Sequence, residues 1–368
     1  MKKLLILSAS TGSGHTKAGE AIAETAKVSF PNLQISHIDV LDYVSSPVKH
    51  AIFHSYDIMI KQVPELWSLL YKRSDNPKLM KKLRSLTKKL NSFNASKLYA
   101  FIEQETPDYI LATHFYGAQL VFSASKKHSM PPVALVMTDY EKHAFLHMPG
   151  LDHYFVSTPR MAWQFTRLGV SKNDITVSGI PISPVFTQKN TLNAKKLLAL
   201  PDKKTVLLLS GGQGMANIAE LCSAIMDSGE ELSLVAIAGK SKRLENRLRN
   251  ITPTKNVSLA VLGWTDNMPA YMAAADIVVT KPGGLTTSEC IAMKKPILST
   301  SPIPGQEEHN AEYILGQQFG KILHSLDDLL YYTTLQTQEI APGYRIVKTK
   351  QPAAQVILHT VVNKITDN

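Results

Sequence analysis

The stretch Ala275–Asn310 reads ADIVVTKPGGLTTSECIAMKKPILSTSPIPGQEEHN and decides the fold. Its apolar run at 277–280 is followed by Lys281-Pro282-Gly283-Gly284, a turn that cannot continue a strand. Residues 285–293 then have the pattern of a helix, and a second apolar run follows at 296–298. A strand, a glycine-rich turn, a helix and a strand in this order predict a βαβ unit of a parallel sheet.

This glycine turn lies where parallel sheets bind ligands, at the carboxyl ends of the strands. A helix that begins there offers unpaired N–H groups and a partial positive charge to a phosphate. Glu289 stands one helical turn beyond Leu285, within reach of a hydroxyl beside that phosphate, and Gln306-Glu307-Glu308 suit sugar hydroxyls. The pattern indicates a nucleotide-sugar pocket, although an ordinary βα turn has the same glycines.

The totals describe a globular chain of two α/β domains. It has 368 residues, of which 44% are hydrophobic and 19% charged. Its two cysteines, Cys222 and Cys290, indicate neither a disulfide framework nor a cysteine-rich metal site, and they are expected to be buried free thiols. The apolar run Leu4–Leu7 is too short for a signal peptide, and none approaches the roughly 18 residues that span a bilayer. We therefore expect a cytoplasmic protein, at most peripheral on the cytoplasmic face of the membrane.

The amino-terminal region repeats the pattern of strand, glycine loop and helix over Leu4–Leu7, SASTGSGH at 8–15 and a helix at 16–28. The loop is neither a Walker loop nor a dinucleotide fingerprint, because Lys17 stands where the fingerprint needs glycine. His15 begins the helix, where the dipole disfavours its protonated form. A neutral imidazole at a strand end can accept a proton from an alcohol, but a capping or merely exposed histidine also fits.

Positive charge is concentrated between Lys72 and Lys97, where nine basic residues and the single acid Asp75 hold +8 of the net charge of +10. Apolar residues fall on one stripe and predict a basic amphipathic helix: Leu79, Leu83, Leu86, Leu90 and Phe93. Three interpretations stay open. The helix is a solvated surface element, or it contacts an anionic membrane with Trp67 and Tyr71 just upstream, or it binds nucleic acid. No base-stacking pattern supports nucleic acid.

Apolar runs at 33–40, 108–113, 133–137, 152–156 and 174–177 predict the other strands of the first half. His114, Asp139 and His143 stand at or just past strand ends. Their spacing matches no metal motif, so we interpret them as polar residues lining a cleft between domains.

The segment GIPISP at 179–184 is the natural linker, and the pattern then restarts. Strands are expected at 205–210, 232–238, 257–262 and 277–280, with a Gly211-Gly212-Gln213-Gly214 turn and a helix at 215–226. Beyond Gly320 only a closing helix at 353–362 is predicted. The chain divides into domains 1–180 and 181–345 and a segment 346–368 that packs back on the first domain. The fold class is α/β, with two Rossmann-like doubly wound domains.

Six motifs occur in order: SASTGSGHTKAGEAI (8–22), VMTDYEKH (136–143), VSGIPISPVF (177–186), LLLSGGQG (207–214), VLGWTDNMPAYMAAADIVVTKPGGLTTSE (261–289) and IPGQEEHNA (303–311). Together they resemble the monogalactosyldiacylglycerol synthase and processive diacylglycerol glucosyltransferase family, in glycosyltransferase family 28 of the GT-B superfamily. More distantly they resemble the undecaprenyl-linked N-acetylglucosaminyltransferase of peptidoglycan synthesis. The resemblance implies two domains facing a cleft. It also implies inverting transfer of a hexose, glucose or galactose, from a UDP-sugar to diacylglycerol without metal or other cofactor.

The resemblance also implies site residues. His15 and Asp139 are catalytic, with His15 as the base. The donor is bound by Gly211, Gly212, Gly214, Gly263, Trp264, Gly283, Gly284, Leu285, Thr286, Glu289, Gln306 and Glu307. Within this set the glycines of 211–214 and Gly283-Gly284 face the diphosphate, and the loop around Gly263-Trp264 flanks the uracil. Glu289 holds the ribose, and Gln306 and Glu307 contact the sugar. The acceptor and the anionic membrane surface are contacted by Gly14, His143, Trp67, Lys81, Lys82, Lys88 and Lys89.

Two positions depart from the family pattern. Ser183 replaces a basic residue common in the linker, and Phe145-Leu146 stands where the family commonly has tryptophan. Both departures concern the acceptor or the hinge and not the nucleotide. A UDP-sugar epimerase and a non-catalytic UDP-sugar sensor that acts through its membrane helix are the alternatives, and the oligomeric state stays open.

Overall fold

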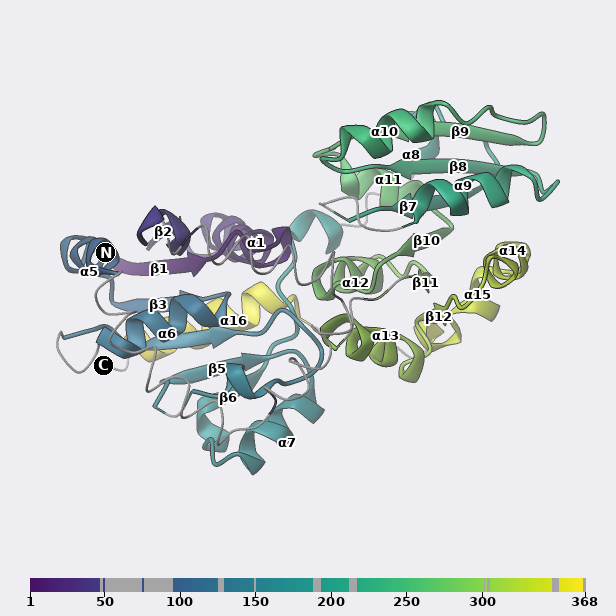
Figure 1. Cartoon of the computed structure of the whole chain (residues 1–368). Coiled ribbons are helices and arrows are strands. Elements are labelled where there is room, and N and C mark those ends of the chain that lie inside the picture. Colours follow the sequence, from purple (N-terminus) through teal and green to yellow (C-terminus); the bar gives the residue numbers. More distant parts are fainter. Residues whose placement is uncertain are drawn as a thin grey trace. The chain divides into compact units, whose positions relative to one another are not determined.

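The computed structural model describes residues 1–46, 49, 75, 95–124, 129–148, 150–187, 193–211, 217–300, 302, 305–345 and 351–366. The N-terminal unit comprises Met1–Pro184, Ile303–Gln306 and Lys350–Asn368, and the C-terminal unit comprises Val185–Pro302 and Glu307–Thr349. Each contains a six-stranded parallel sheet with helices around it (Figure 1). The prediction of two Rossmann-like α/β domains is confirmed. The amphipathic helix expected over 79–93, with Trp67, Lys81, Lys82, Lys88 and Lys89, lies outside the described residues, as do Gly212 and Gly214.

The N-terminal sheet has the strand order β2-β1-β3-β4-β5-β6. Its strands are β1 (Lys2–Ser8), β2 (Leu33–Asp39), β3 (Tyr109–Ala112), β4 (Val133–Val136), β5 (His153–Val156) and β6 (Ile175–Val177). Its α-helices are α1 (Ser13–Ser29), α5 (Ser96–Glu105), α6 (Phe115–Ala124), α7 (Pro159–Arg167) and α16 (Ala353–Thr366). The 3₁₀ turns η1 (Val40–Asp42), η2 (Ala144–Leu146), η3 (Lys172–Asp174) and η4 (Pro184–Thr187) lie in the connections.

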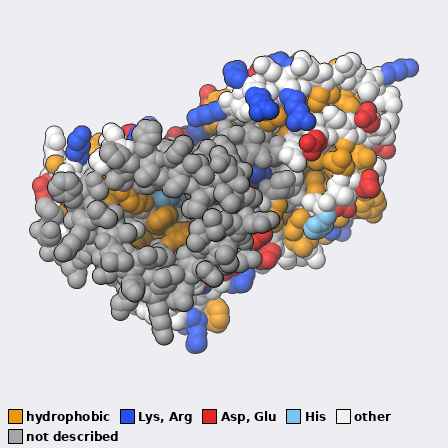
Figure 2. All heavy atoms as spheres, viewed as in Figure 1, with side chains coloured by type: hydrophobic (Ala, Val, Ile, Leu, Met, Phe, Trp, Pro, Cys, Tyr) orange, Lys and Arg blue, Asp and Glu red, His pale blue; other side chains and the backbone are white. Residues whose placement is uncertain are grey.

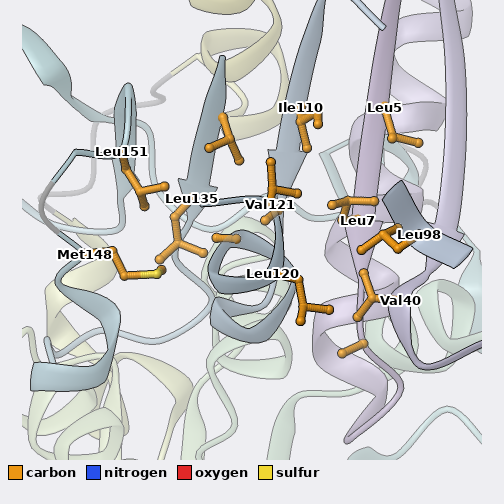
Figure 3. Packing of buried hydrophobic residues seen from close by; sticks show 14 of the residues in the cluster. Leu5, Leu7, Val40, Leu98, Ile110, Leu120, Val121, Leu135, Met148 and Leu151 are labelled. Atoms are coloured by element: carbon orange, nitrogen blue, oxygen red, sulfur yellow. The ribbon is translucent and has the colours of Figure 1, made fainter. Parts of the chain in front are cut away.

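The inner strands β1, β3, β4 and β5 are buried on both faces, which is why they are mostly apolar. The edge strand β2 is only partly buried and carries polar residues between its apolar ones. In β1, Leu5 and Leu7 point into the cluster built with α5, α6 and α7, where Leu98, Leu120 and Val121 pack (Figure 3). Their neighbours in β1 point to the opposite face, because successive side chains of a strand alternate.

Helix α16 covers that opposite face beside α1. Ile357, Leu358 and Val361 are fully buried there, together with Ile22 and Ala26 of α1. The carboxyl-terminal segment, yellow in Figure 1, thus contributes to the core of the N-terminal unit. The helix is longer than the predicted 353–362 because its apolar stripe continues to Ile365, which is also buried.

The C-terminal sheet has the order β12-β11-β10-β7-β8-β9. Its strands are β7 (Lys204–Leu209), β8 (Leu232–Ile237), β9 (Val257–Leu262), β10 (Ile277–Thr280), β11 (Ile297–Ser299) and β12 (Gly320–Ile322). The helices are α8 (Ala194–Leu197), α9 (Ile218–Met226), α10 (Lys242–Arg249), α11 (Met268–Ala274), α12 (Gly284–Ala292), α13 (Gln306–Gly316), α14 (Leu326–Thr334) and α15 (Thr337–Ile340), with the 3₁₀ turn η5 (Pro342–Arg345).

Some elements were not predicted. The edge strand β12 and helices α14 and α15 follow Gly320, where the sequence pattern fades. Gln306–Glu308 were expected in a loop and instead form the first turn of α13. Cys222 and Cys290 are buried free thiols, as predicted.

Each sheet has one place where the strand order reverses. In the N-terminal sheet it lies between β1 and β3, and in the C-terminal sheet between β7 and β10. Ligands of open α/β sheets bind at the carboxyl ends of the strands at this switch point. The first turn of α1, which carries His15, and the turn that carries Gly283 follow strands β1 and β10, so the fold places both at the expected ligand sites.

Basic side chains also gather on the C-terminal unit. Figure 2 shows Lys and Arg over the region where α10 lies in Figure 1. This helix carries Lys242, Arg243, Arg247 and Arg249.

No helix among the described residues is both long and apolar enough to cross a membrane.

Candidate functional site

His15 lies in the first turn of α1, next to the end of β3. Its Nδ1 is 2.7 Å from the carbonyl oxygen of Thr113 and 3.1 Å from Oγ1 of Thr138. A carbonyl oxygen only accepts hydrogen bonds, so Nδ1 carries the proton of the neutral ring. The acceptor nitrogen of the neutral ring is then Nε2, as a general base requires.

The surroundings of His15 also favour its neutral form. Burial lowers the pKa of His15, while the negative charge of Asp139 and the hydrogen bond to Thr113 act in the opposite direction. Burial is the larger effect, so the pKa lies below its ordinary value. His15 and Asp139, the two residues predicted to be catalytic, therefore interact electrostatically.

Thr113 holds His15 through two bonds. Besides the carbonyl contact to the ring, its hydroxyl donates to the carbonyl oxygen of His15 at 2.9 Å. Ser8 Oγ lies 2.9 Å from Thr113 Oγ1 and 2.8 Å from Nε2 of His37. A continuous chain of hydrogen bonds thus runs from β2 through β1 and β3 to the start of α1. It fixes the backbone that carries the imidazole.

Gly19 of α1 is required by this chain of hydrogen bonds. A Cβ at this position would lie 2.5 Å from Nε2 of His37 and 2.6 Å from Oγ of Ser8. We expect Gly19→Ala to lower the free energy of unfolding by about 1–3 kcal/mol, measured by chemical denaturation, because the inserted methyl group displaces both side chains.

The control for this prediction is the double variant Gly19→Ala/His37→Ala. It removes the His37 ring, one of the two side chains that the methyl group meets, and keeps the better helix propensity of alanine. It should be more stable than Gly19→Ala alone. If the second substitution adds to the loss, the contact with His37 is not its cause.

A row of four aromatic rings leads away from His15. The ring of His114 lies edge-on to His15 at 4.5 Å between centroids, Phe115 follows at 4.5 Å, Phe145 at 4.6 Å, and His143 at 4.2 Å from Phe145. Burial and the neighbouring His15 lower the pKa of His114 well below its usual range. Beside His15 thus lie the neutral ring of His114 and, next to it, that of Phe115, a suitable surface for the apolar part of an acceptor.

The other predicted acceptor residues have different environments. Gly14 directly precedes His15 in the first turn of α1 and is partly exposed. His143 is buried, and its Nδ1 accepts from the backbone N–H of Phe145 at 3.3 Å, which caps η2. His143 therefore supports the loop after β4.

In the C-terminal unit two glycine turns follow the adjacent strands β7 and β10. Gly211 has φ +74°, a left-handed conformation that favours glycine. Gly283 is the N-cap of α12, where no side chain caps the helix and a Cβ would meet nothing within 4 Å. The first turn of α12 carries no acidic residue. The unpaired N–H groups at the start of α12 are therefore available to an anion.

The start of α12 presents several predicted donor residues together. Gly283, Leu285, Thr286 and Glu289 keep solvent-accessible surface, whereas Gly284 is buried. Residues three and four apart share a helix face, which places Glu289 beside Leu285 and Thr286. The structure therefore brings a carboxylate next to the open helix start.

Gly263 and Trp264 follow β9, which β8 separates from β7. Trp264 is 45% exposed, and Nζ of Lys240 lies 4.9 Å from its ring centroid. A Cβ on Gly263 would lie 2.7 Å from Oε2 of Glu245, so the turn packs directly on this carboxylate. An exposed aromatic face beside a cation is suited to stacking with a planar base.

Glu307 lies in the first turn of α13 and forms an ion pair with Lys281, the residue after β10. Nζ of Lys281 is 3.0 Å from Oε1 of Glu307. Gln306 begins the same helix. The ion pair thus links Glu307 to the turn that carries Gly283 and Gly284.

Three residues that contact predicted site residues were not themselves predicted: Thr113, Thr138 and Lys281. Each directly follows a strand or stands beside a predicted site residue, so position at a strand end was the available signal. Their partners lie 98, 123 and 26 residues away, and no local pattern reveals such contacts. In the part of the chain that the structure describes, no three or more His, Cys, Asp or Glu side chains are grouped to hold a metal ion.

Comparison with known protein families matches both halves of the chain. Residues 15–182 match the monogalactosyldiacylglycerol (MGDG) synthase family, and residues 205–338 match the glycosyltransferase family 28 C-terminal domain. Among solved structures, Acinetobacter baumannii MurG is similar with a TM-score of 0.61 and 12% identity, covering 100% of both chains. Staphylococcus aureus MnaA with UDP is similar with a TM-score of 0.58 and 14% identity, covering 100% of this chain and 97% of that one. At these identities the structures show the fold alone.

Closer relatives are similar along most of their length. The processive diacylglycerol beta-glucosyltransferase of Staphylococcus carnosus is 29% identical over 355 residues, which is 92% of this chain and 85% of the relative. That of Staphylococcus aureus is 30% identical over 342 residues, which is 89% of this chain and 83% of the relative. The resemblance read from the motifs is confirmed, and the chain is a glycosyltransferase that belongs to the family of monogalactosyldiacylglycerol synthases and processive diacylglycerol glucosyltransferases.

Proposed function

We propose that this protein transfers glucose or galactose from a UDP-sugar to the free hydroxyl of diacylglycerol, with inversion at the anomeric carbon and without a metal. The observation that carries the proposal is the hydrogen bond from Nδ1 of His15 to the carbonyl of Thr113, which leaves Nε2 as a proton acceptor. The names of the relatives support the lipid acceptor, and the MnaA structure with UDP supports the nucleotide.

In this mechanism Nε2 of His15 accepts the proton of the acceptor hydroxyl, and the hydroxyl oxygen forms the new bond to the anomeric carbon. The bond from that carbon to the diphosphate oxygen breaks, and UDP leaves with the electron pair. The unpaired N–H groups at the start of α12 stabilise the negative charge that develops on UDP. Attack on the face opposite the leaving group inverts the anomeric configuration.

Access to the acceptor requires contact with a lipid surface. The basic segment between Lys72 and Lys97 lies outside the described residues, apart from Asp75 and 95–97, and its net charge of +8 favours anionic lipid. We propose that the protein binds the cytoplasmic face of the membrane peripherally through this segment, including Lys81, Lys82, Lys88 and Lys89, with Trp67 upstream.

The test is incubation of the purified protein with UDP-glucose or UDP-galactose and anionic vesicles that contain diacylglycerol, followed by mass spectrometry of the lipids. We expect glycosyl-diacylglycerol from one of the two donors, and UDP release only when diacylglycerol is present. Turnover of UDP-N-acetylglucosamine without an acceptor would instead favour an epimerase. Tight UDP-sugar binding without transfer would favour a sensor.

A further inference from the structure

Lys281, which begins the glycine turn after β10, forms an ion pair with Glu307. Nζ of Lys281 lies 3.0 and 3.4 Å from the two carboxylate oxygens of Glu307. The two side chains are only 10% and 12% exposed. The contact is therefore a largely buried ion pair in which the ammonium group is bound to both oxygens.

The pair connects three elements around the switch point of the sheet. Lys281 follows β10, and a Cβ on Gly211 would lie 3.4 Å from its Cε, so the stem of the lysine passes directly along the turn after β7. Glu307 is in the first turn of α13. The lysine thus reaches from the glycine turns, where a diphosphate is proposed to bind, to the carboxylate proposed to contact the hexose.

Stability alone does not explain such a pair. Two charges lose hydration on burial, and their attraction often does no better than a well-packed apolar pair of similar size. Loss of one partner, however, leaves the other charge buried and unpaired. The ammonium group of Lys281 therefore restrains the position of the Glu307 carboxylate. A carboxylate has about four lone-pair positions, more than one ammonium group occupies.

We propose that Lys281 is a positioning residue for donor recognition. It fixes the carboxylate of Glu307 in the orientation that accepts hydrogen bonds from the hydroxyl groups of the donor hexose. This inference rests on the proposed UDP-hexose donor. Lys281 acts through Glu307, and neither the uridine nor the diphosphate depends on the ion pair. Its loss therefore affects the binding of the sugar and not that of the nucleotide.

The test compares the binding of UDP and of UDP-hexose by calorimetry, with both UDP-glucose and UDP-galactose. In Lys281→Met we expect the affinity for the preferred UDP-hexose to fall about tenfold or more, the effect of losing a hydrogen bond to a charged group. The affinity for UDP should change less than about twofold, within the usual scatter of such effects. Glu307→Gln should show the same pattern, and the double variant should lose no more than the larger single loss, because both substitutions remove one coupled unit.

Lys281→Arg is the conservative control, since it keeps a cation and should retain most of the affinity for UDP-hexose. An equal loss of UDP and UDP-hexose in Lys281→Met would overturn the inference, because the ammonium group would then serve the diphosphate or the fold. Unchanged binding of both ligands would also overturn it. Failure of the unaltered protein to bind UDP at all is a different result, which rejects the proposed donor itself.

Discussion

Replacement of His15 by alanine is expected to lower turnover by about 10²–10⁴-fold, the usual contribution of a positioned general base. The ring supplies the proton acceptor Nε2, and its other nitrogen is already bound to the carbonyl of Thr113. Neither Thr138 nor Thr113 can take over, because a hydroxyl or a carbonyl is a far weaker base than imidazole. The rate is measured as UDP release with diacylglycerol in vesicles, and UDP affinity is measured in parallel by calorimetry.

The control is His359→Ala in α16, an exposed histidine whose ring centroid lies 4.9 Å from that of Phe30. This variant should keep both turnover and UDP affinity. His15→Ala should keep UDP affinity, since the donor residues all belong to other elements. Full turnover in His15→Ala would remove this residue from the mechanism, and a parallel loss of UDP affinity would indicate a structural defect.

The fold was largely predictable because its signals are local. Buried parallel strands such as 277–280 are short apolar runs, and glycine turns such as Gly283-Gly284 mark where they end. The elements after Gly320 were missed for a physical reason. β12 is a three-residue edge strand that is fixed by its pairing with β11, and its own sequence carries almost no strand pattern.

The candidate site was predictable only in part. His15 and Gly283 could be identified, because each follows a strand and begins a helix. The partners that orient His15 and Glu307 could not be identified, because they are brought together by strand pairing between distant segments. Ile6 pairs with Leu111 in the register that brings Thr113 next to the start of α1, and this register is a property of the whole sheet.

Asp139 influences His15 without occupying the usual place of a carboxylate on Nδ1. That nitrogen is bound to the carbonyl of Thr113, and Thr138 Oγ1 is also within 3.1 Å of it. Asp139 acts through its charge, which raises the pKa of His15 against the larger lowering by burial. In the proposed mechanism its charge also stabilises the imidazolium that forms when the acceptor hydroxyl gives up its proton. Removal of the charge therefore has two consequences for the rate. A lower pKa of His15 favours its neutral form at low pH, whereas a less stable imidazolium lowers the plateau, and a pH–rate profile separates the two.

Asp139→Asn is expected to move the acidic limb of the pH–rate profile to lower pH and to lower the plateau. His15 must be neutral to act, so activity is present above its pKa and is lost as the pH falls through it. Removal of the negative charge lowers this pKa further, which shifts the limb downward. The imidazolium formed during transfer loses the same stabilisation. As a result, kcat/KM at high pH falls by at most about tenfold for each unit of pKa lost, because the proton is only partly transferred in the transition state.

Glu141→Gln is the matched control, because this carboxylate lies two residues further along the same loop. Its Oε2 is 2.9 Å from Nη1 of Arg160, and the other oxygen accepts from Gln164, so its charge is already compensated by α7. The acidic limb should therefore stay in place in Glu141→Gln. An upward shift in Asp139→Asn, or the same downward shift in both variants, would contradict a direct electrostatic effect of Asp139 on His15. A lower plateau without any shift would instead assign Asp139 to the binding of the acceptor, because a group that only binds substrate leaves the proton affinity of the base unchanged.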